Sequence, residues 1–241
     1  MIIYGPKGKA REYSELACNL FTGCLHKCRY CYCPAIMHKT LEQWSSDPQP
    51  KKDIIKKLEK EAAKIAGCEK EILFCFMSDP YQSAEAAEIT RQALLICEKY
   101  RLRVQVLTKA GLNATRDFDI LKRNNWKFGS TIIFQSEKYR LIYEPGAPSI
   151  ESRYEAVKKA HEMGIYTWVS VEPVIYPEQA IGVMSDLKPY VNFWKVGKLN
   201  HFEEIEAGID WADFLQKTKQ TLSGVDYYIK KDLAKYETII S

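Results

Sequence analysis

Apolar and polar positions along the chain follow two periods, one typical of strands and the other of helices. Apolar runs rich in β-branched and aromatic residues predict buried strands at about residues 16–21, 71–76, 103–108, 126–134, 167–175 and 191–199. Amphipathic segments between and after them predict helices at about residues 53–67, 84–100, 115–125, 149–164, 177–190 and 210–223. Asp53 and Asp210 are expected to cap two of these helices.

The regular alternation of strands and helices predicts an α/β fold with a parallel sheet and right-handed connections. Such units form either an open doubly wound sheet or a partial barrel, and periodicity does not distinguish the two. In both folds the ligand site lies at the carboxyl ends of the strands. No linker is evident, so we expect a single domain over residues 1–241, with a core over about 16–222 and a C-terminal tail over 223–241.

Composition adds few constraints to this picture. Hydrophobic residues make up 46% of the 241 residues, charged residues make up 27%, and the formal net charge is +4. These values are ordinary for a globular protein and do not require an anionic partner. The N-terminal residues lack the apolar segment of a secretory signal, and the apolar runs are too short to cross a membrane. We therefore expect a cytoplasmic protein without a membrane partner.

The stretch "GCLHKCRYCYCP", residues 23–34, holds the clearest chemical motif. Cys24, Cys28 and Cys31 are spaced C-x3-C-x2-C and directly follow the first predicted strand. In a reducing compartment, clustered cysteines indicate metal binding or catalysis rather than disulfides. A structural zinc site needs a fourth ligand, for which Cys33, His26 and His38 are the candidates. A 4Fe–4S cluster held by only three thiolates would instead keep one iron atom open for an external ligand.

The motif resembles that of the radical S-adenosylmethionine (SAM) superfamily, and other segments resemble its spore photoproduct lyase-like branch. In chain order, the matching segments are "GCLHKCRYCYCP", "MSDPYQSAEAAEITRQAL", "VLTKAGLNATRDFDIL" and "YEPGAPSIESRYEAVKKAHEMGI". The resemblance runs from about residue 16 to residue 179.

The resemblance implies a partial (β/α)6 TIM-like barrel. It also implies a 4Fe–4S cluster held by Cys24, Cys28 and Cys31, with SAM bound to the fourth iron. The enzyme would cleave SAM reductively to a 5′-deoxyadenosyl radical, which abstracts hydrogen from a substrate that the sequence does not identify. An electron donor such as flavodoxin or ferredoxin is implied as a partner, and the substrate is expected to be a macromolecule such as a peptide or a nucleic acid.

Several residues acquire cofactor or catalytic roles through the resemblance. Tyr30 would stack near the SAM adenine and Tyr32 would face the radical site, although both could simply pack around the loop. Ser78 and Asp79 would hold the SAM amino group in place of the glycines usual in the superfamily. Their alternative role is to cap the next helix.

Lys109 would lie near the SAM carboxylate, and a small polar side chain on the fourth strand would contact the carboxylate or the ribose. That side chain is Ser130 or Thr131, because alternate residues of a strand face opposite sides and the register is open.

Two charged residues interrupt strands that otherwise read as buried. Glu172 lies in "WVSVEPVI" and Lys195 in "FWKVGKL". A buried charge is costly unless it is paired or functional. The two side chains could pair across the barrel, or they could contact the SAM ribose or the substrate. Arg153 begins a helix, where a cation is disfavoured, so it is expected to contact an anion or a carboxylate.

Three alternative functions remain open at this level. The first is DNA photoproduct repair, as in the spore photoproduct lyase, but Phe76 stands where that enzyme has its hydrogen-donor cysteine. Cys75 lies one position away and is expected to face the opposite side of its strand. The second alternative is a zinc-bearing nucleic-acid-binding module. The third is a metal-stabilised hydrolase, for which Asp79 and Glu172 are the candidate carboxylates.

Overall fold

A curved sheet with helices on its outer face forms the fold in the computed structural model, which describes residues 1–200 and 202–239. Within these residues, the main sheet has the strand order β1-β2-β5-β6-β7-β8-β9-β10. The strands are β1 (Ile3–Tyr4), β2 (Leu16–Cys18), β5 (Glu71–Phe74), β6 (Arg103–Thr108), β7 (Lys127–Thr131), β8 (Tyr166–Val174), β9 (Phe193–Lys198) and β10 (Asp226–Ile229).

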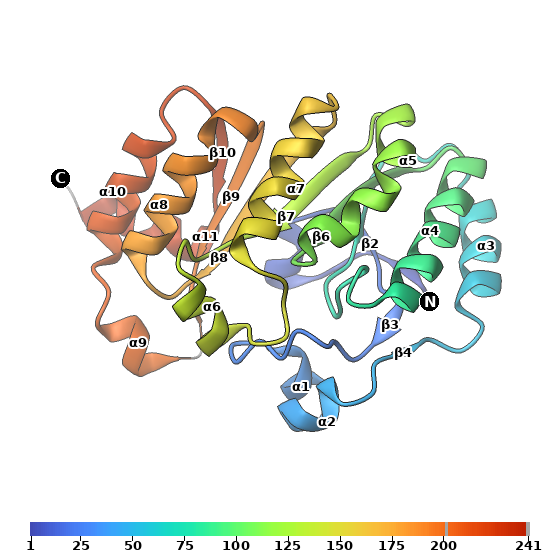
Figure 1. Cartoon of the computed structure of the whole chain (residues 1–241), viewed down its shortest axis with the longest axis horizontal. Coiled ribbons are helices and arrows are strands. Elements are labelled where there is room, and N and C mark those ends of the chain that lie inside the picture. The colour runs from blue at the N-terminus through green and yellow to red at the C-terminus, as the bar shows by residue number, and fades with distance from the viewer. Residues whose placement is uncertain (201, 240–241) are drawn as a thin grey trace.

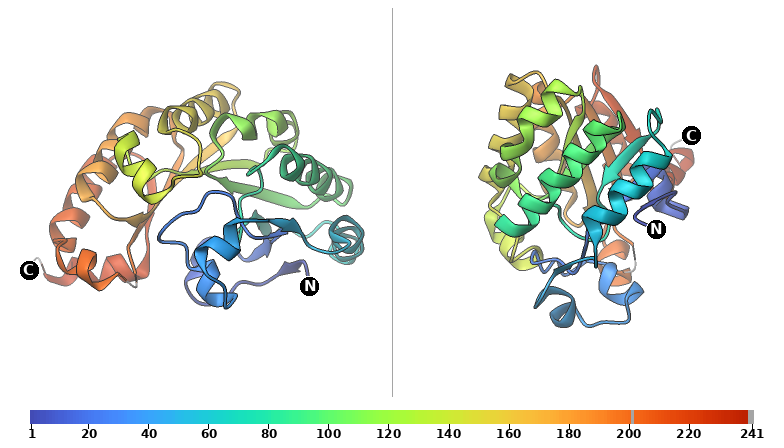
Figure 2. Two further views of the ribbon diagram at one scale, coloured as in Figure 1. Left: turned by 60° about the horizontal axis from the view of Figure 1, so that its bottom comes forward. Right: turned by 90° about the vertical axis from the view of Figure 1, so that its right-hand side faces the viewer.

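Every pairing from β2 to β10 is parallel, and β1 pairs with β2 antiparallel. The sheet curls into an arch whose two ends do not pair, as the left view of Figure 2 shows. The predicted partial TIM-like barrel is therefore confirmed. Its inner, concave face lies opposite the helices and is free to form a site.

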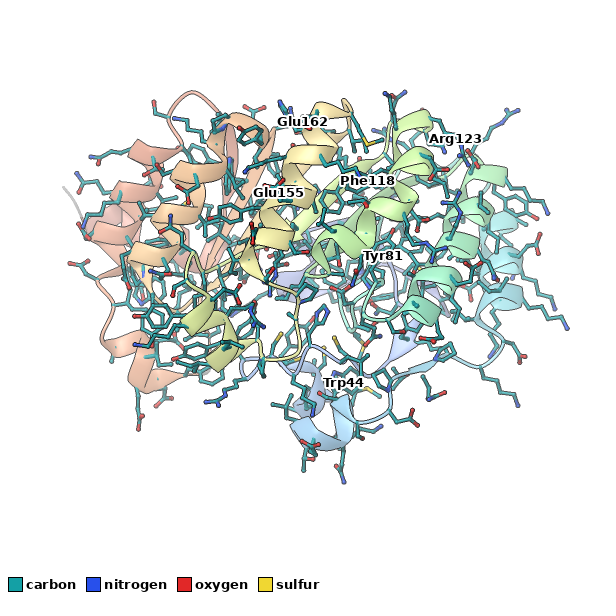
Figure 3. All side chains as sticks on the ribbon, viewed as in Figure 1. Trp44, Tyr81, Phe118, Arg123, Glu155 and Glu162 are labelled. Carbon is teal, nitrogen blue, oxygen red and sulfur yellow. The ribbon has the colours of Figure 1, made fainter. Side chains whose placement is uncertain are left out.

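Long helices cover the convex face, between consecutive strands (Figure 1). They are α3 (Ile54–Lys64), α4 (Ala84–Lys99), α5 (Phe118–Arg123), α7 (Ile150–Glu162), α8 (Pro177–Leu187) and α10 (Trp211–Thr221). Their apolar faces pack on the sheet, where Phe118 is buried, while charged residues such as Arg123, Glu155 and Glu162 lie on the outer faces (Figure 3). None of the helices in the described ranges has the length and apolar character that crossing a membrane requires.

Shorter elements gather at the carboxyl ends of the strands. They are β3 (Phe21–Thr22), β4 (Gln49–Pro50), α1 (Cys33–Ile36), α2 (Leu41–Ser45), α6 (Glu137–Tyr143) and α9 (Glu203–Ala207). Figure 1 shows α1, α2, α6 and α9 along one edge of the molecule, with α1 and α2 in a small lobe that contains the buried Trp44 (Figure 3). This edge is the one where parallel α/β folds place their sites.

All of the helices and strands predicted from the periodicity are present, with shifts at their ends. Asp210 caps α10 as predicted, since its carboxylate accepts hydrogen bonds from the backbone of Ala212 and Asp213. The prediction for Asp53 is wrong. Its backbone is left-handed, with φ 55°, and its side chain makes no capping hydrogen bond.

Several elements were not predicted from the sequence. Strand β10 adds a further parallel strand beside β9 and lies in the segment expected to be a tail. It is followed by α11 (Lys231–Ala234) and the 3-10 helix η4 (Lys235–Ile239). At the other end of the chain, β1 and the 3-10 helix η1 (Gly8–Glu12) precede the first predicted strand. The remaining 3-10 helices are η2 (Gly111–Asp117) and η3 (Lys188–Tyr190).

Candidate functional site

A cavity of about 700 Å³ opens at the carboxyl ends of the strands, inside the arch. Its size lies within the range usual for sites that bind small molecules. Most of the predicted site residues line this one cavity: Cys24, Cys28, Cys31, Tyr30, Tyr32, Ser78, Asp79, Lys109, Thr131 and Glu172. The fold therefore brings together side chains from the loops after β3, β5 and β6 and from strands β7 and β8.

Residues 22–34, the cluster loop, carry the three cysteines of the motif. Gly23 begins the loop with φ +96°, and a Cβ there would lie 2.7 Å from the Trp44 carbonyl oxygen, so this position requires glycine. The Cys24 N–H donates to the Trp44 carbonyl oxygen at 3.3 Å. The Leu25 N–H donates to the Gln82 side chain at 2.8 Å. The loop is thus fixed to α2 on one side and to the β5–α4 connection on the other.

The arrangement of the three thiols bears on the kind of metal site that they would form. Among the described residues, no three Cys, His, Asp or Glu side chains are grouped to hold one metal ion. A single zinc ion needs its thiolates about 4 Å apart, whereas a 4Fe–4S cube binds each thiolate through a different iron. Cys24, Cys28 and Cys31 all line the cavity, whose volume of about 700 Å³ leaves room for a cluster and a further ligand.

The thiols differ in their protonation. Burial raises the pKa of Cys24, and it raises the pKa of Cys28 to about 12. A hydrogen bond with Cys33 lowers the pKa of Cys31 to about 7, against the effect of burial. Cys31 is therefore the most readily ionised of the three thiols.

Ser78 and Asp79 both line the cavity, but they are not equally free. Asp79 is buried, and its carboxylate accepts hydrogen bonds from the Tyr81 N–H at 2.9 Å, the Thr108 hydroxyl at 2.7 Å and the Lys109 N–H at 2.6 Å. These bonds tie the ends of β5 and β6 together. The cap of α4 is Ser83, so neither Ser78 nor Asp79 has the capping role considered above.

Lys109, Tyr30 and Thr131 form one wall of the cavity. The Lys109 ammonium group lies 5.7 Å from the centroid of the Tyr30 ring. Burial acts to lower the pKa of Lys109, but the Cys28 thiolate, where it forms, and the Glu144 carboxylate raise it overall, so the side chain is a cation. Thr131 lines the cavity, whereas Ser130 does not and has a buried hydroxyl without a partner. The register left open by the sequence thus places Thr131 toward the site.

Glu172 also lines the cavity, on strand β8 beside β7, and is paired, although not with Lys195. Both of its carboxylate oxygens accept hydrogen bonds from the Lys230 ammonium group at 2.8 Å. The Tyr13 hydroxyl also donates to Glu172. A Cβ on Gly197 would lie 2.7 Å from the Glu172 carboxyl carbon, so the glycine on β9 makes room for this ion pair.

Lys195 is the predicted site residue that the structure places elsewhere. It does not line the cavity, and its ammonium group donates to the carbonyl oxygens of Glu12 at 3.1 Å and Tyr13 at 2.7 Å. The suggested Glu172–Lys195 pair is therefore not formed. The reason is that the N-terminal segment enters the barrel, a position that the sequence did not predict. Its carbonyl oxygens accept the hydrogen bonds of the Lys195 ammonium group.

Cys75 also departs from the prediction. It was expected to face away from the site, but strand β5 ends at Phe74, and both Cys75 and Phe76 line the cavity. Because the chain has left the strand, the alternation of sides no longer applies. The Cys75 thiol is 3.4 Å from the Ser78 hydroxyl.

Reasoning from sequence missed several residues that build the site. Tyr13 and Lys230 flank Glu172, and Gln82 anchors the cluster loop. Glu144 was quoted within a motif but given no role; its carboxylate binds Arg153, which confirms the expected carboxylate partner of that arginine. The segments "YEPG" and "MSDPYQ" were available signals for Glu144 and Gln82. Tyr13 and Lys230 lie outside the matching segments.

Comparison with known proteins agrees with the cluster loop and the fold. The sequence model of the radical SAM superfamily matches residues 18–183. An uncharacterized protein of Methanocaldococcus jannaschii is 29% identical over 207 residues, which are 83% of this chain and 74% of the relative. An uncharacterized protein of Acidianus two-tailed virus is 26% identical over 204 residues, which are 75% of this chain and 62% of that protein.

Solved structures share the architecture at low identity. A mutant of spore photoproduct lyase superposes with a TM-score of 0.68 and 16% identity, covering 93% of this chain and 79% of the lyase. Streptococcus suis SuiB bound to S-adenosylmethionine superposes with a TM-score of 0.62 and 14% identity, covering 91% of this chain and 51% of SuiB. These likenesses establish a shared fold.

Proposed function

This chain belongs to the radical SAM superfamily, and from that premise we propose that it holds a 4Fe–4S cluster and SAM in the cavity of the arch. Members of the superfamily generally use both cofactors, and reductive cleavage of SAM is their general reaction. The observation that carries the proposal is that Cys24, Cys28 and Cys31 line one cavity together with a half-buried cation, Lys109.

In this proposal, Cys24, Cys28 and Cys31 would hold the cluster. When bound, the cluster and SAM would supply the electron and the 5′-deoxyadenosyl radical for hydrogen abstraction from the substrate. The protein's own task is to bind, orient and shield. Buried Cys28 and Asp79 and half-buried Cys24 and Cys31 limit access of water to this end of the cavity.

Several residues that line the cavity offer complementary contacts for SAM. Lys109 pairs with its carboxylate, since an ammonium group and a carboxylate form a charge-assisted bond. The Ser78 hydroxyl accepts from its ammonium group, and Tyr30 and Thr131 flank the same wall. On strand β8, beside β7, Glu172 is paired with Lys230 and offers a carboxylate that accepts from ribose hydroxyls.

The substrate enters from the open edge of the arch, and we propose that it is a macromolecule. Tyr32 is 49% exposed and Ile36 is 60% exposed where they line the cavity, and Met37 follows them. Exposed apolar residues beside a site often mark contact with a large partner. Lys39 is exposed between α1 and α2, and Arg29 is exposed on the cluster loop. Their charge suits an acidic electron donor such as flavodoxin or ferredoxin.

A second candidate, DNA photoproduct repair, is favoured by one observation. The spore photoproduct lyase-like resemblance implies a hydrogen-donor cysteine, and the Cys75 thiol lines the cavity even though Phe76 occupies the lyase position. In this candidate Cys75 returns a hydrogen atom to the substrate. The zinc-module and hydrolase alternatives gain no such support, since Asp79 is bound by the backbone and Glu172 by Lys230.

The proposal predicts that anaerobically reconstituted, dithionite-reduced protein converts SAM to 5′-deoxyadenosine and methionine. Chromatography of the reaction measures both products. Cys28→Ala should abolish them because it removes a cluster ligand, whereas Cys68→Ala, at a half-buried thiol outside the cavity, should not. Iron-loaded wild-type protein that releases no 5′-deoxyadenosine would contradict the proposal.

A further inference from the structure

A buried network joins the cluster loop to the segment between α6 and α7. We name Tyr30, Glu144 and Arg153 the brace. Arg153 Nη1 donates to Glu144 Oε2 at 2.5 Å, and the Tyr30 hydroxyl donates to Glu144 Oε1. The side chains of Glu144 and Arg153 are both 0% exposed. A buried carboxylate is tolerated only with hydrogen-bonded or charged partners, and each oxygen of Glu144 has one.

The brace reaches the cavity through residues that line it. Tyr30 itself lies in the wall, and the Lys109 ammonium group rests 5.7 Å from the centroid of its ring. Arg153 Nη1 also donates to the carbonyl oxygen of Thr131, at 3.3 Å. Burial alone would raise the pKa of Glu144, but Arg153 and Lys109 hold it below its ordinary value, so the brace contains an ionised carboxylate.

The cluster loop is already attached to the same segment by backbone contacts. The Arg29 N–H donates to the Tyr143 carbonyl oxygen at 2.8 Å, and the Gly146 N–H donates to the His26 carbonyl oxygen at 3.0 Å. A Cβ on Gly146 would lie 2.1 Å from the Leu25 carbonyl oxygen, so the two segments are in close contact. The side chains of the brace are therefore not needed merely to keep the loop in place.

Arg140 offers an internal comparison. It is buried, and its Nη1 donates to the carbonyl oxygens of Glu144 at 3.2 Å and Ala147 at 2.8 Å. These bonds stabilise the segment between α6 and α7, but no contact of Arg140 reaches Tyr30, Thr131 or Lys109. Arg140 and Arg153 are thus both buried and both bind the segment between α6 and α7. Of the two, only Arg153 also binds a residue that lines the cavity, Thr131.

We propose that Glu144 and Arg153 are positioning residues at the wall that receives SAM. They fix the orientation of Tyr30 and Thr131 and, through the Tyr30 ring, the position of the Lys109 ammonium group. This inference rests on the proposed function, because it concerns the SAM site. Glu144 holds the phenol in one rotamer, and the ring supports the lysine. Arg153 fixes the backbone of Thr131 from the opposite side.

Three variants and one matched control test the proposal. Tyr30→Phe removes a single hydroxyl and leaves the ion pair. Glu144→Gln keeps the shape of the side chain and removes its charge. The double variant Glu144→Gln/Arg153→Met removes both buried charges together, which restores neutrality if the single variant does not fold. Arg140→Met removes hydrogen bonds to the backbone of the same segment, including the one to the Glu144 carbonyl oxygen, and leaves the side-chain contacts of the brace in place.

The measurements are the SAM dissociation constant by anaerobic equilibrium dialysis, the iron content, and the rate of tryptic cleavage after Arg29 in the cluster-free full-length protein. Loss of an outer partner of a binding residue typically weakens a site by 10- to 100-fold. We expect Glu144→Gln and the double variant to weaken SAM binding about tenfold, and Tyr30→Phe about threefold. Arg140→Met should stay within about twofold of the wild type.

Iron content and cleavage rate separate positioning from simple loss of structure. The proposal expects both to be similar in Glu144→Gln and Arg140→Met, because the backbone contacts remain in each. Unchanged SAM affinity in the brace variants, or an equal loss in Arg140→Met, would overturn it. Wild-type protein that binds neither a cluster nor SAM would instead overturn the proposed function and, with it, this inference.

Discussion

Lys195 carries an ammonium group inside the barrel, where its acceptors are backbone oxygens rather than a carboxylate. Its side chain lies over the rings of Tyr13, at 4.8 Å, and Trp168, at 5.4 Å. Burial, followed by the nearby charges of Lys230 and Lys127, lowers its pKa from 10.5 to about 8. Folding therefore places the Lys195 side chain in surroundings that favour its neutral amine over its ammonium form.

This lowered pKa predicts that Lys195 makes the free energy of unfolding depend on pH. Between about pH 8 and pH 10.5 the unfolded chain binds a proton at this side chain that the folded chain does not, so stability rises with pH across that window. Compared with Lys195→Met, the wild type should gain on the order of 2 kcal/mol from pH 8 to pH 10. Urea unfolding of both proteins at the two pH values measures the difference.

The Lys195→Met protein serves as the reference because other titrating groups contribute equally to both proteins and cancel. Parallel dependence of stability on pH in the two proteins would mean that Lys195 keeps an ordinary pKa.

The individual site residues differ in how far the sequence could predict them. Cys24, Cys28 and Cys31 were recognisable as a candidate metal motif because three cysteines lie close together in the chain. The partners of Glu172 could not be recognised from the sequence. Tyr13 and Lys230 lie 159 and 58 residues away from it, and only the folded barrel brings them together. Without them, Lys195 was the nearest available explanation for a buried carboxylate.

The N-terminal segment is the element whose role is least evident from its sequence. Gln105 and Lys195 donate to the Tyr13 carbonyl oxygen from inside the barrel. Glu12 accepts hydrogen bonds from the Tyr228 hydroxyl and the Lys231 N–H, both at 2.9 Å. The segment therefore connects β2, on one side of the arch, with β10 and α11 on the other.

Removing one acceptor in this connection should destabilise the fold. Glu12→Ala leaves the Tyr228 hydroxyl and the Lys231 N–H without their charged acceptor, and we expect a loss of about 2 kcal/mol. Glu15→Ala is the matched control. Glu15 is exposed, and its ion pairs with Arg11 and Lys70 are 3.4 and 3.7 Å long, so its loss should cost less than about 0.5 kcal/mol. Urea unfolding monitored by circular dichroism compares the two, and equal losses would contradict this role for the segment.

Elements with a sustained period were predicted, and short irregular ones were not. The long helices and the six central strands follow from periodicity, because each buries one face or both. Strand β10 has four residues, of which Tyr227 and Tyr228 carry polar groups, and its partner β9 is more than 25 residues away. The elements η1 and α9 have no buried residues, so no apolar pattern marks them.

At the scale of the molecule, alternation of strands and helices predicts a parallel sheet but not its curvature. The arch leaves β1 and β10 unpaired with each other and opens the concave face at the edge where α1, α6 and α9 lie (Figure 2). The choice of a partial barrel over an open sheet came from the resemblance to the radical SAM superfamily. Periodicity alone could not make it, because both folds repeat the same unit.

Electron paramagnetic resonance of the anaerobically reconstituted, dithionite-reduced protein, recorded with and without SAM, tests whether the chain holds a cluster that binds SAM. We expect a reduced 4Fe–4S signal that changes when SAM is added, because a three-cysteine site leaves one iron open. Cys24→Ala, Cys28→Ala and Cys31→Ala should each abolish the signal, while Cys33→Ala, which changes a neighbouring thiol, should retain it. A protein that binds about one zinc per chain and gives no such signal, or a cluster signal unaffected by SAM, would contradict the account.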